Sequence, residues 1–303
     1  MRSHWIHVIR KALKRAPPLL AGLSPVRRYV ADSSSSVTAF TQLKLTSRVQ
    51  GDLKGVVTIE LRNPKANALG STLVSELEEA VERVAEDNSV RAVVFTSGVP
   101  KVFCAGADLK ERVAMSLNEA EDFVCSLRNL MDAVADIPAP TIAAVEGAAY
   151  GGGLELMLSC DLRVAGAEAV LGLTETSLGI IPGAGGTQRL PRLIGISAAK
   201  ELVFAAKRIS AARALKLGIV GNVVEAGQAE KEAMSLAREI AAGGPLAVRL
   251  AKRAMDTGMQ VRVGITEGME VEREMYARVL RTRDRDEGLL AFKERRPPDF
   301  TGE

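Results

Sequence analysis

Two glutamates, Glu155 and Glu175, lie near glycine-rich segments in the middle of the chain. Glu155 follows three consecutive glycines, Gly151 to Gly153, and Glu175 comes twenty residues later. Consecutive glycines let a backbone approach a ligand closely. A helix that begins there presents N–H groups that have no partner and carry partial positive charge. Because helical residues three apart share a face, we expect Glu155 above the Gly152 N–H. A carboxylate beside such a donor can move protons next to a stabilised anion.

A second backbone donor is expected at Ala107. The segment Phe103–Lys110 follows a predicted strand at Val90–Phe95. Within it, Gly106 permits a tight bend and Asp108 can cap the helix that follows. Two N–H groups from separate strand–turn–helix junctions can bracket one oxygen, which is the geometry of an oxyanion hole. Considered alone, the segment could equally be an ordinary strand-to-helix turn.

Each glutamate could also have a role other than catalysis. A helical glutamate can simply face water, and Glu175 can cap or salt-bridge the next turn. Glu155, however, has Leu154, Leu156 and Met157 as neighbours, so its helix is apolar on most sides. Desolvation there should raise the pKa of its carboxyl toward neutrality, as acid–base catalysis requires. Glu175 alone carries no such argument.

The composition excludes several kinds of site. The two histidines, His4 and His7, lie in a segment that is expected to be removed. The remaining chain can then form neither a Ser-His-Asp or Cys-His relay nor a His-ligated metal site. Cys104, Cys125 and Cys160 are widely spaced and form no C-x-x-C pair, so a disulfide framework or a zinc site is not expected. Acid–base work therefore falls to Asp, Glu, Lys, Tyr or Cys.

Residues 1–31 have the composition of an organellar transit peptide. They contain seven basic residues and no acidic one, and a run of serines follows at Ser33–Ser36. A disordered basic tail that binds an acidic partner is the alternative. Without this segment 33 of the 40 basic residues remain against 37 acidic ones, so the formal net charge changes from +3 to −4. The basic character of the whole chain is thus no evidence for nucleic-acid binding. No apolar run approaches the ~20 residues of a membrane span.

Strand and helix patterns alternate through most of the chain. Apolar strands are predicted at Val56–Leu61, Val90–Phe95 and Thr141–Val145, with helices at Leu73–Val84, Glu119–Ala135 and from Gly152 onward. This alternation predicts a layered α/β core. After a late strand at Val220–Val224 only helices are predicted, at Glu230–Ala242, Pro245–Thr257, Ile265–Leu280 and Arg285–Glu294. A C-terminal helical extension is therefore expected.

The segment Gly183–Gln188 superficially suggests a nucleotide-binding loop. Gln188 stands where G-x-G-x-x-G needs its third glycine, and no strand leads directly into the segment. No G-x-x-x-x-G-K-[ST] occurs in the chain. Neither a Rossmann site nor a P-loop is expected.

Four segments together resemble the enoyl-CoA hydratase (crotonase) family. They are F-C-A-G-A-D-L-K from Phe103, G-G-G-L-E-L from Gly151, T-E-T-S-L-G-I-I-P-G-A-G-G-T-Q-R-L-P from Thr174 and E-G-L-L-A-F-K-E-R-R-P-P from Glu287. The resemblance covers essentially all of residues 43–303. It implies an α/β fold, a crotonase-like spiral of ββα units with a C-terminal helical region that forms trimers, usually stacked as hexamers. The chain would then consist of a transit peptide (1–31), a crotonase-like core (32–241) and a trimerisation region (242–303), and would act in the mitochondrial matrix.

The resemblance also implies which residues act. The Ala107 and Gly152 N–H groups would hold the thioester oxygen of an acyl-CoA, Glu155 would be the base and Glu175 the acid. Other substrate-binding residues would be Asp108, Leu109 and Lys110 beside Ala107, Ala66 at the edge of the site, and Arg295 at a CoA phosphate, where relatives often carry lysine. No cofactor or metal is then required.

The predicted reaction is the addition of water to a trans-2-enoyl-CoA to give a 3-hydroxyacyl-CoA, in fatty-acid or branched-chain amino-acid catabolism. Family isomerases generally rely on one glutamate at the second position, so the presence of both favours a hydratase. A non-catalytic acyl-CoA-binding or RNA-binding protein is the other alternative. One relative is known to bind RNA through a lysine-rich helix after its second strand. The corresponding segment here, Ser71–Asn88, has six acidic residues and one arginine, a charge of −5 that repels phosphate. The acyl group stays open: the shape of the pocket depends on loops such as Arg112–Asn118, and no residue there dictates chain length, branching or a distal carboxylate.

Overall fold

The computed structural model describes residues 40–48, 50–260 and 265–303. The predicted transit peptide and its boundary at residue 31 lie outside the described residues. The fold below is that of the unit Phe40–Glu303.

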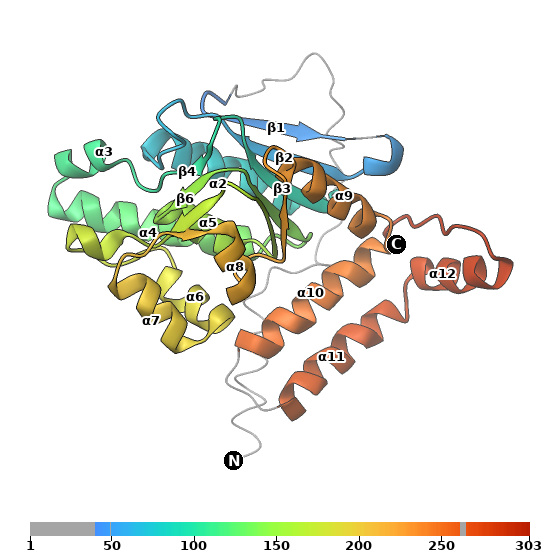
Figure 1. Cartoon of the computed structure of the whole chain (residues 1–303). Coiled ribbons are helices and arrows are strands. Elements are labelled where there is room, and N and C mark those ends of the chain that lie inside the picture. The colour runs from blue at the N-terminus through green and yellow to red at the C-terminus, as the bar shows by residue number, and fades with distance from the viewer. Residues whose placement is uncertain (1–39, 49, 261–264) are drawn as a thin grey trace. The chain divides into compact units, whose positions relative to one another are not determined.

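The main sheet has six strands in the order β1-β2-β3-β5-β7-β10 (Figure 1). These strands are β1 (Leu43–Ser47), β2 (Val56–Leu61), β3 (Ala92–Ser97), β5 (Thr141–Val145), β7 (Leu162–Gly166) and β10 (Asn222–Val224). Only β1 is antiparallel to its neighbour. In the centre of the sheet Val93 pairs with Val57 on one side and with Thr141 on the other.

A second, smaller sheet has the order β4-β6-β8-β9. Its strands are β4 (Val102–Cys104), β6 (Ala148–Tyr150), β8 (Val170–Gly172) and β9 (Ile209–Ser210). Strands β4, β6 and β8 each follow a strand of the main sheet, and a helix comes after each of them. This repeated strand–strand–helix order is the predicted spiral of ββα units, and it is confirmed.

The helices before the C-terminal region are short to medium in length. They are α2 (Ser71–Glu86), α3 (Leu109–Ala114), α4 (Leu117–Ala135), α5 (Gly152–Ser159), α6 (Gly186–Ile194), α7 (Ile196–Phe204), α8 (Ala211–Leu217) and α9 (Ala229–Ala241), with 3-10 turns η1 (Gly51–Leu53) and η2 (Glu175–Leu178). Local sequence sets several of their starts. Ser116 and Glu119 form a capping box at α4, for example, so α4 begins two residues earlier than its apolar pattern predicts.

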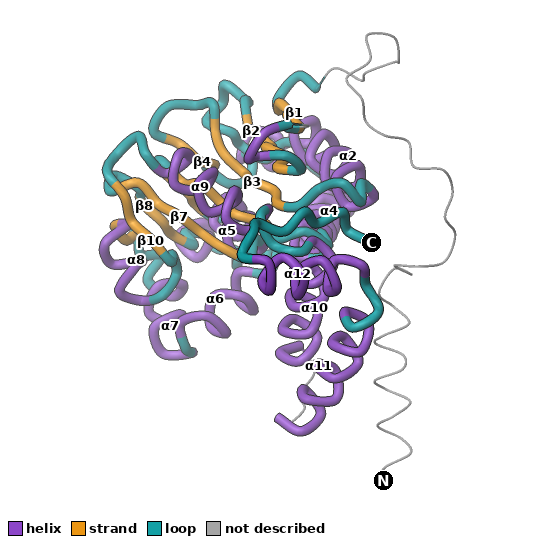
Figure 2. Tube along the Cα trace, turned by 90° about the vertical axis from the view of Figure 1, so that its right-hand side faces the viewer, coloured by secondary structure: helices purple, strands orange, loops and turns teal. Residues whose placement is uncertain are grey.

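The two faces of the main sheet pack against different helices (Figure 2). Along β3, Val93 and Phe95 belong to the large apolar core that α2, α4 and α5 cover. The alternate residues Ala92 and Val94 face α9, whose buried face consists of alanines at four-residue spacing. Small side chains at this spacing let α9 lie close to the sheet. Both faces of the sheet are therefore buried, as its near-continuous apolar strands predict.

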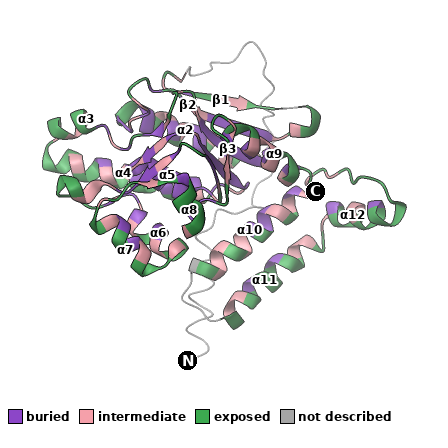
Figure 3. Ribbon diagram, in the orientation of Figure 1, coloured by how far each residue is buried: buried purple, intermediate pink, exposed green. Residues whose placement is uncertain are grey.

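The C-terminal helices are α10 (Pro245–Gln260), α11 (Ile265–Val279) and α12 (Arg283–Glu294). Helices α10 and α11 pack against each other (Figure 1). Buried Lys252 attaches α10 to the core by donating to the Ile137 carbonyl at 2.8 Å and to Asp161 Oδ2 at 2.7 Å. Much of α11 and α12 stays exposed or half-buried (Figure 3). The predicted helical C-terminal region is confirmed, and its role in trimerisation stays a prediction.

None of the described helices is long and apolar enough to cross a membrane.

Candidate active site

Two backbone N–H groups meet where β4 and β6 end. The Leu69 N–H donates to the Gly106 carbonyl at 2.8 Å, and the Asp108 N–H donates to the Leu69 carbonyl at 3.2 Å, which fixes the backbone on both sides of Ala107. Gly106 has φ +92°, and a Cβ there would lie 2.7 Å from the Tyr150 carbonyl oxygen, so only glycine fits this bend.

The Ala107 and Gly152 donors lie close together. A Cβ placed on Gly152 would lie 3.9 Å from the Ala107 nitrogen. Gly152 is the first residue of α5, whose N–H groups at this end lack intrahelical acceptors. Neither of the two N–H groups has an acceptor among the described residues. Both donors are therefore available to one ligand oxygen.

Helix α5 approaches β4 so closely that a side chain does not fit between them. A Cβ on Gly153 would lie 2.1 Å from the Cys104 carbonyl oxygen. This contact explains the third glycine of the sequence run, and it places the start of α5 beside the Ala107 segment.

Glu155 is buried, with 3% of its surface exposed. Its Oε1 accepts hydrogen bonds from the Ala184 N–H at 2.8 Å and from the Gly186 N–H at 2.7 Å. Burial raises the pKa of the Glu155 carboxyl, while these two hydrogen bonds and the charges of Arg189 and Arg128 act in the opposite direction. The expected direction of the change in its pKa is confirmed. The two donors favour the ionised form, so Glu155 has the environment of a base.

Two arginines hold the loop that binds Glu155. Arg128 donates from Nε and a terminal nitrogen to the Gly183 carbonyl, at 3.3 and 3.2 Å. Arg189 donates to the Ala184 carbonyl at 3.1 Å and forms an ion pair with Asp132 at 2.6 Å. The carbonyls of the loop thus face cations on α4 and α6, while its N–H groups face the carboxylate.

Glu175 is half-buried and begins η2. Burial, with a smaller contribution from the charge of Glu155, raises the pKa of its carboxyl to about 7. Its buried Oε2 has no hydrogen-bond partner among the described residues. A carboxyl that is poorly solvated and close to a negative charge favours its protonated form. Glu175 therefore has the environment of an acid near neutral pH.

One pocket of about 150 Å³ brings these groups together. Ala107 and Gly152 line it with the two glutamates, and its other walls are mainly apolar side chains and loop backbone; among its lining residues are Leu109, Arg112, Val124, Leu127, Leu178, Ile180, Ile181 and Ala184. Two free N–H donors and two carboxyl groups can together stabilise an oxyanion and move protons beside it.

Of the other predicted substrate-binding residues on this side of the unit, only Leu109 is among the described residues that line the pocket. Leu109 lines the pocket, whereas Asp108 caps α3 by accepting from the Lys110 and Glu111 N–H groups. Lys110 is exposed on α3, and the Ala66 carbonyl accepts from the Ala105 N–H at 3.0 Å.

Arg295 is not brought to the pocket of its own chain. It ends α12, which lies at the opposite side of the unit from α3 (Figure 1).

The role of the glycine-rich loop in binding Glu155 was not predicted from the sequence. The sequence of the segment Gly183–Gly186 predicted only that it is no nucleotide-binding loop. In the structure, its Ala184 and Gly186 N–H groups bind the carboxylate of Glu155 in the same chain. The available signal was its glycine content, because a glycine-rich loop can turn its backbone donors toward one anion whether that anion is a phosphate or a carboxylate.

The family can now be stated. The sequence profile of the Enoyl-CoA hydratase/isomerase family matches residues 51–303. The crystal structure of an enoyl-CoA hydratase from Bacillus anthracis superimposes with a TM-score of 0.83 at 45% identity, covering 87% of this chain and all of that one. The chain belongs to the enoyl-CoA hydratase/isomerase family, and it has the crotonase fold that the resemblance implies.

Two kinds of curated relatives match over most of the chain. Mitochondrial enoyl-CoA hydratase domain-containing protein 2 from Mus musculus is 49% identical over 276 residues, covering 89% of this chain and 93% of its own. Mitochondrial methylglutaconyl-CoA hydratase from Homo sapiens is 44% identical over 291 residues, covering 94% and 84%. Their names confirm the mitochondrial location expected from the resemblance.

Proposed function

We propose that the chain is a hydratase that adds water across the double bond of a 2-enoyl-CoA to give a 3-hydroxyacyl-CoA. The observation that carries this proposal is the pairing of Glu155 and Glu175 in one pocket. One carboxyl has two N–H donors that favour its charged form, and the other has a raised pKa of about 7. Hydration needs this combination of a base and an acid.

Glu155 takes a proton from water, and the water oxygen forms a bond to the β-carbon. The electrons of the double bond move toward the thioester, whose oxygen becomes negative between the Ala107 and Gly152 N–H groups. Glu175 gives its proton to the α-carbon. Proton exchange with solvent then restores both carboxyl groups, so the step uses no cofactor or metal.

The function is tested by incubating purified residues 32–303 with crotonyl-CoA and with a branched and a medium-chain enoyl-CoA. Loss of the conjugated-thioester absorbance, with a 3-hydroxyacyl-CoA as product, is the expected result. Movement of the double bond without uptake of water would make the chain an isomerase instead. Binding of acyl-CoA without any conversion would favour a non-catalytic role.

The proposed acid predicts how the rate depends on pH. Glu175 donates a proton only while it is protonated, so the active form is present below its pKa of about 7 and is lost as the pH rises through that value. We expect kcat/KM for hydration, measured from pH 5 to 9, to fall tenfold per unit above about pH 7. A profile that stays level to pH 9 would contradict the assignment of Glu175 as the acid.

We further propose that the C-terminal helices assemble the chain into trimers in the mitochondrial matrix. Exposed apolar side chains on these helices include Met255, Met259, Ile265, Tyr276 and Phe292. Their burial between subunits would be favourable. Since α12 lies away from the pocket of its own chain, a neighbouring copy would have to present Arg295 to a CoA phosphate.

A further inference from the structure

One cation lines the pocket without a part in the proposed reaction. Arg112 on α3 contributes to the same wall as the apolar side chains of Val124 and Leu127, and the pocket also contains Glu155 and Glu175. The sequence of the loop that begins at Arg112 did not dictate the acyl group. The position of Arg112 in the pocket adds a charged group that the acyl chain can contact.

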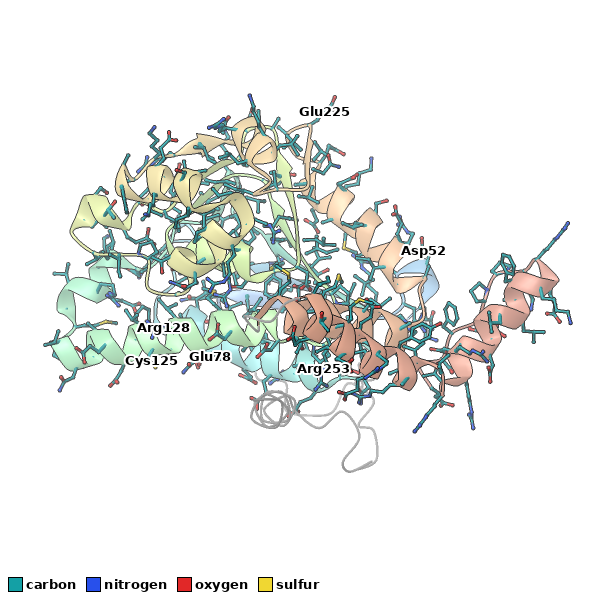
Figure 4. The ribbon with its side chains drawn as sticks, turned by 90° about the horizontal axis from the view of Figure 1, so that it is seen from below. Asp52, Glu78, Cys125, Arg128, Glu225 and Arg253 are labelled. Carbon is teal, nitrogen blue, oxygen red and sulfur yellow. The ribbon has the colours of Figure 1, made fainter. Side chains whose placement is uncertain are left out.

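Arg112 lies at the junction of two cavities. A second cavity of about 440 Å³ is lined by Arg112, Leu117, Ala120, Glu121, Val124, Cys125 and Arg128. Arg112 and Val124 line both cavities, so the two are adjacent, and neither glutamate lines the second. Cys125 and Arg128 lie on α4 (Figure 4). A ligand that occupies both cavities therefore passes Arg112.

The Arg112 guanidinium is only weakly engaged by the protein. One terminal nitrogen donates to the Ala120 carbonyl at 3.4 Å, and the group lies over the Phe123 ring at 5.5 Å from its centre. It forms no ion pair with any described residue. A guanidinium has five N–H donors. Most of its hydrogen-bonding capacity is therefore available to a ligand.

The neighbouring charged groups do not take this role. Arg128 already donates twice to the Gly183 carbonyl and so supports the loop that holds Glu155. Glu121 is exposed and is not within ion-pair distance of Arg112. Arg112 is thus the cation with free donors among the described residues that line the pocket.

We propose that Arg112 binds a carboxylate at the far end of the acyl group, so that the preferred substrate is a short 2-enoyl-CoA that ends in a carboxylate. This inference rests on the proposed hydratase function and names its substrate class. Arginine pairs with a carboxylate through two parallel hydrogen bonds. The apolar walls around Arg112 strengthen that interaction relative to water.

Size and chemistry both place this anion on the acyl group. A cavity of about 150 Å³ holds a ligand of roughly six heavy atoms, the size of benzene. The phosphates of CoA are separated from the thioester by the long pantetheine arm. An anion that lies beside the reacting carbons, in the pocket of Glu155 and Glu175, therefore belongs to the acyl chain and not to CoA.

The test compares two thioesters with the same five-carbon chain. Glutaconyl-CoA ends in a carboxylate, and trans-2-pentenoyl-CoA ends in a methyl group. We expect the unmodified chain to hydrate glutaconyl-CoA with the higher kcat/KM. Arg112→Met, which keeps the length of the side chain and removes its charge, is expected to lower kcat/KM for glutaconyl-CoA by roughly 10- to 100-fold, the range of a charged hydrogen bond. Its kcat/KM for pentenoyl-CoA is expected to stay unchanged.

Matched variants complete the experiment. Arg112→Lys keeps the charge but cannot form two parallel hydrogen bonds, so its kcat/KM for glutaconyl-CoA is expected to lie between those of the unmodified chain and Arg112→Met. Arg213→Met removes an exposed arginine on α8 and is expected to leave kcat/KM for both thioesters unchanged. Equal losses of Arg112→Met on both thioesters would overturn the inference, because Arg112 would then act on CoA or on the fold. Equal rates on both thioesters in all variants would also overturn it, while leaving the hydratase function intact. Failure of the unmodified chain to hydrate either thioester would instead refute the proposed function.

Discussion

Replacing either pocket glutamate by glutamine is expected to reduce hydration by about 10²- to 10⁴-fold, the contribution of a positioned acid or base. In Glu155→Gln the amide oxygen can still accept from the Ala184 and Gly186 N–H groups, but the side chain can no longer take a proton from water. In Glu175→Gln the proton for the α-carbon is lost. Acyl-CoA binding is expected to persist in both variants, because neither change removes the backbone donors. Steady-state hydration rates and calorimetric binding of a saturated acyl-CoA measure the two effects.

Stability measurements separate this loss from damage to the fold. The pKa of Glu175 is raised from 4.5 to about 7 in the folded chain. At a pH between these two pKa values, unfolding releases a proton from Glu175. The free energy of unfolding therefore falls as the pH rises from about 4.5 to 7. Above pH 7, Glu175→Gln is expected to be more stable than the unmodified chain, by on the order of 1–2 kcal/mol after allowance for its partial exposure.

The control for both substitutions is Glu168→Gln, which changes an exposed glutamate in the turn between β7 and β8. It is expected to leave both rate and stability unchanged. Near-normal turnover in Glu155→Gln or Glu175→Gln would refute the mechanism with two carboxyl groups. Lower stability of Glu175→Gln above pH 7 would show that this carboxyl serves the fold.

The central strands β2, β3 and β5 were predictable from local pattern because they are buried on both faces, although β3 begins two residues later than predicted, whereas β1 and β7 were not predicted. Thr141–Val145 was predicted with its observed bounds, and Val56–Leu61 likewise. The second sheet was not predicted, since β4, β6 and β8 have three residues each, too few to show a period. Helix α6 was also missed: it begins in a glycine pair and contains Pro191, both of which normally indicate a loop.

The site was predictable in type but not in its connections. Neighbouring leucines were enough to predict that burial would raise the pKa of Glu155. Its two hydrogen bonds come from residues 29 and 31 positions away, and nothing in the local sequence specifies such a distant contact. The same holds for Arg112, whose place in the pocket depends on how α3 packs against α4 and not on its own neighbours.

The oxyanion donor at Gly152 can be removed with little change to the backbone. Gly152 is the first residue of α5, where proline is tolerated because its missing N–H has no intrahelical acceptor. We expect Gly152→Pro to lower kcat for hydration by about 10²- to 10³-fold, as loss of one such donor does elsewhere. Stopped-flow measurement at saturating substrate gives this rate independently of binding.

Gly152→Ala is the matched control because it adds a Cβ but keeps the N–H. That Cβ would lie 2.9 Å from Leu69 Cδ1, the end of a flexible side chain that can move aside. The alanine variant therefore carries the steric cost of the added Cβ, and the proline variant in addition loses the N–H and has its ring Cδ in place of the hydrogen. If both variants hydrate at the same rate, the Gly152 N–H does not stabilise the oxyanion. A rate that falls only in the proline variant, with similar thermal unfolding and similar calorimetric binding of a saturated acyl-CoA in the two variants, assigns the effect to the hydrogen bond.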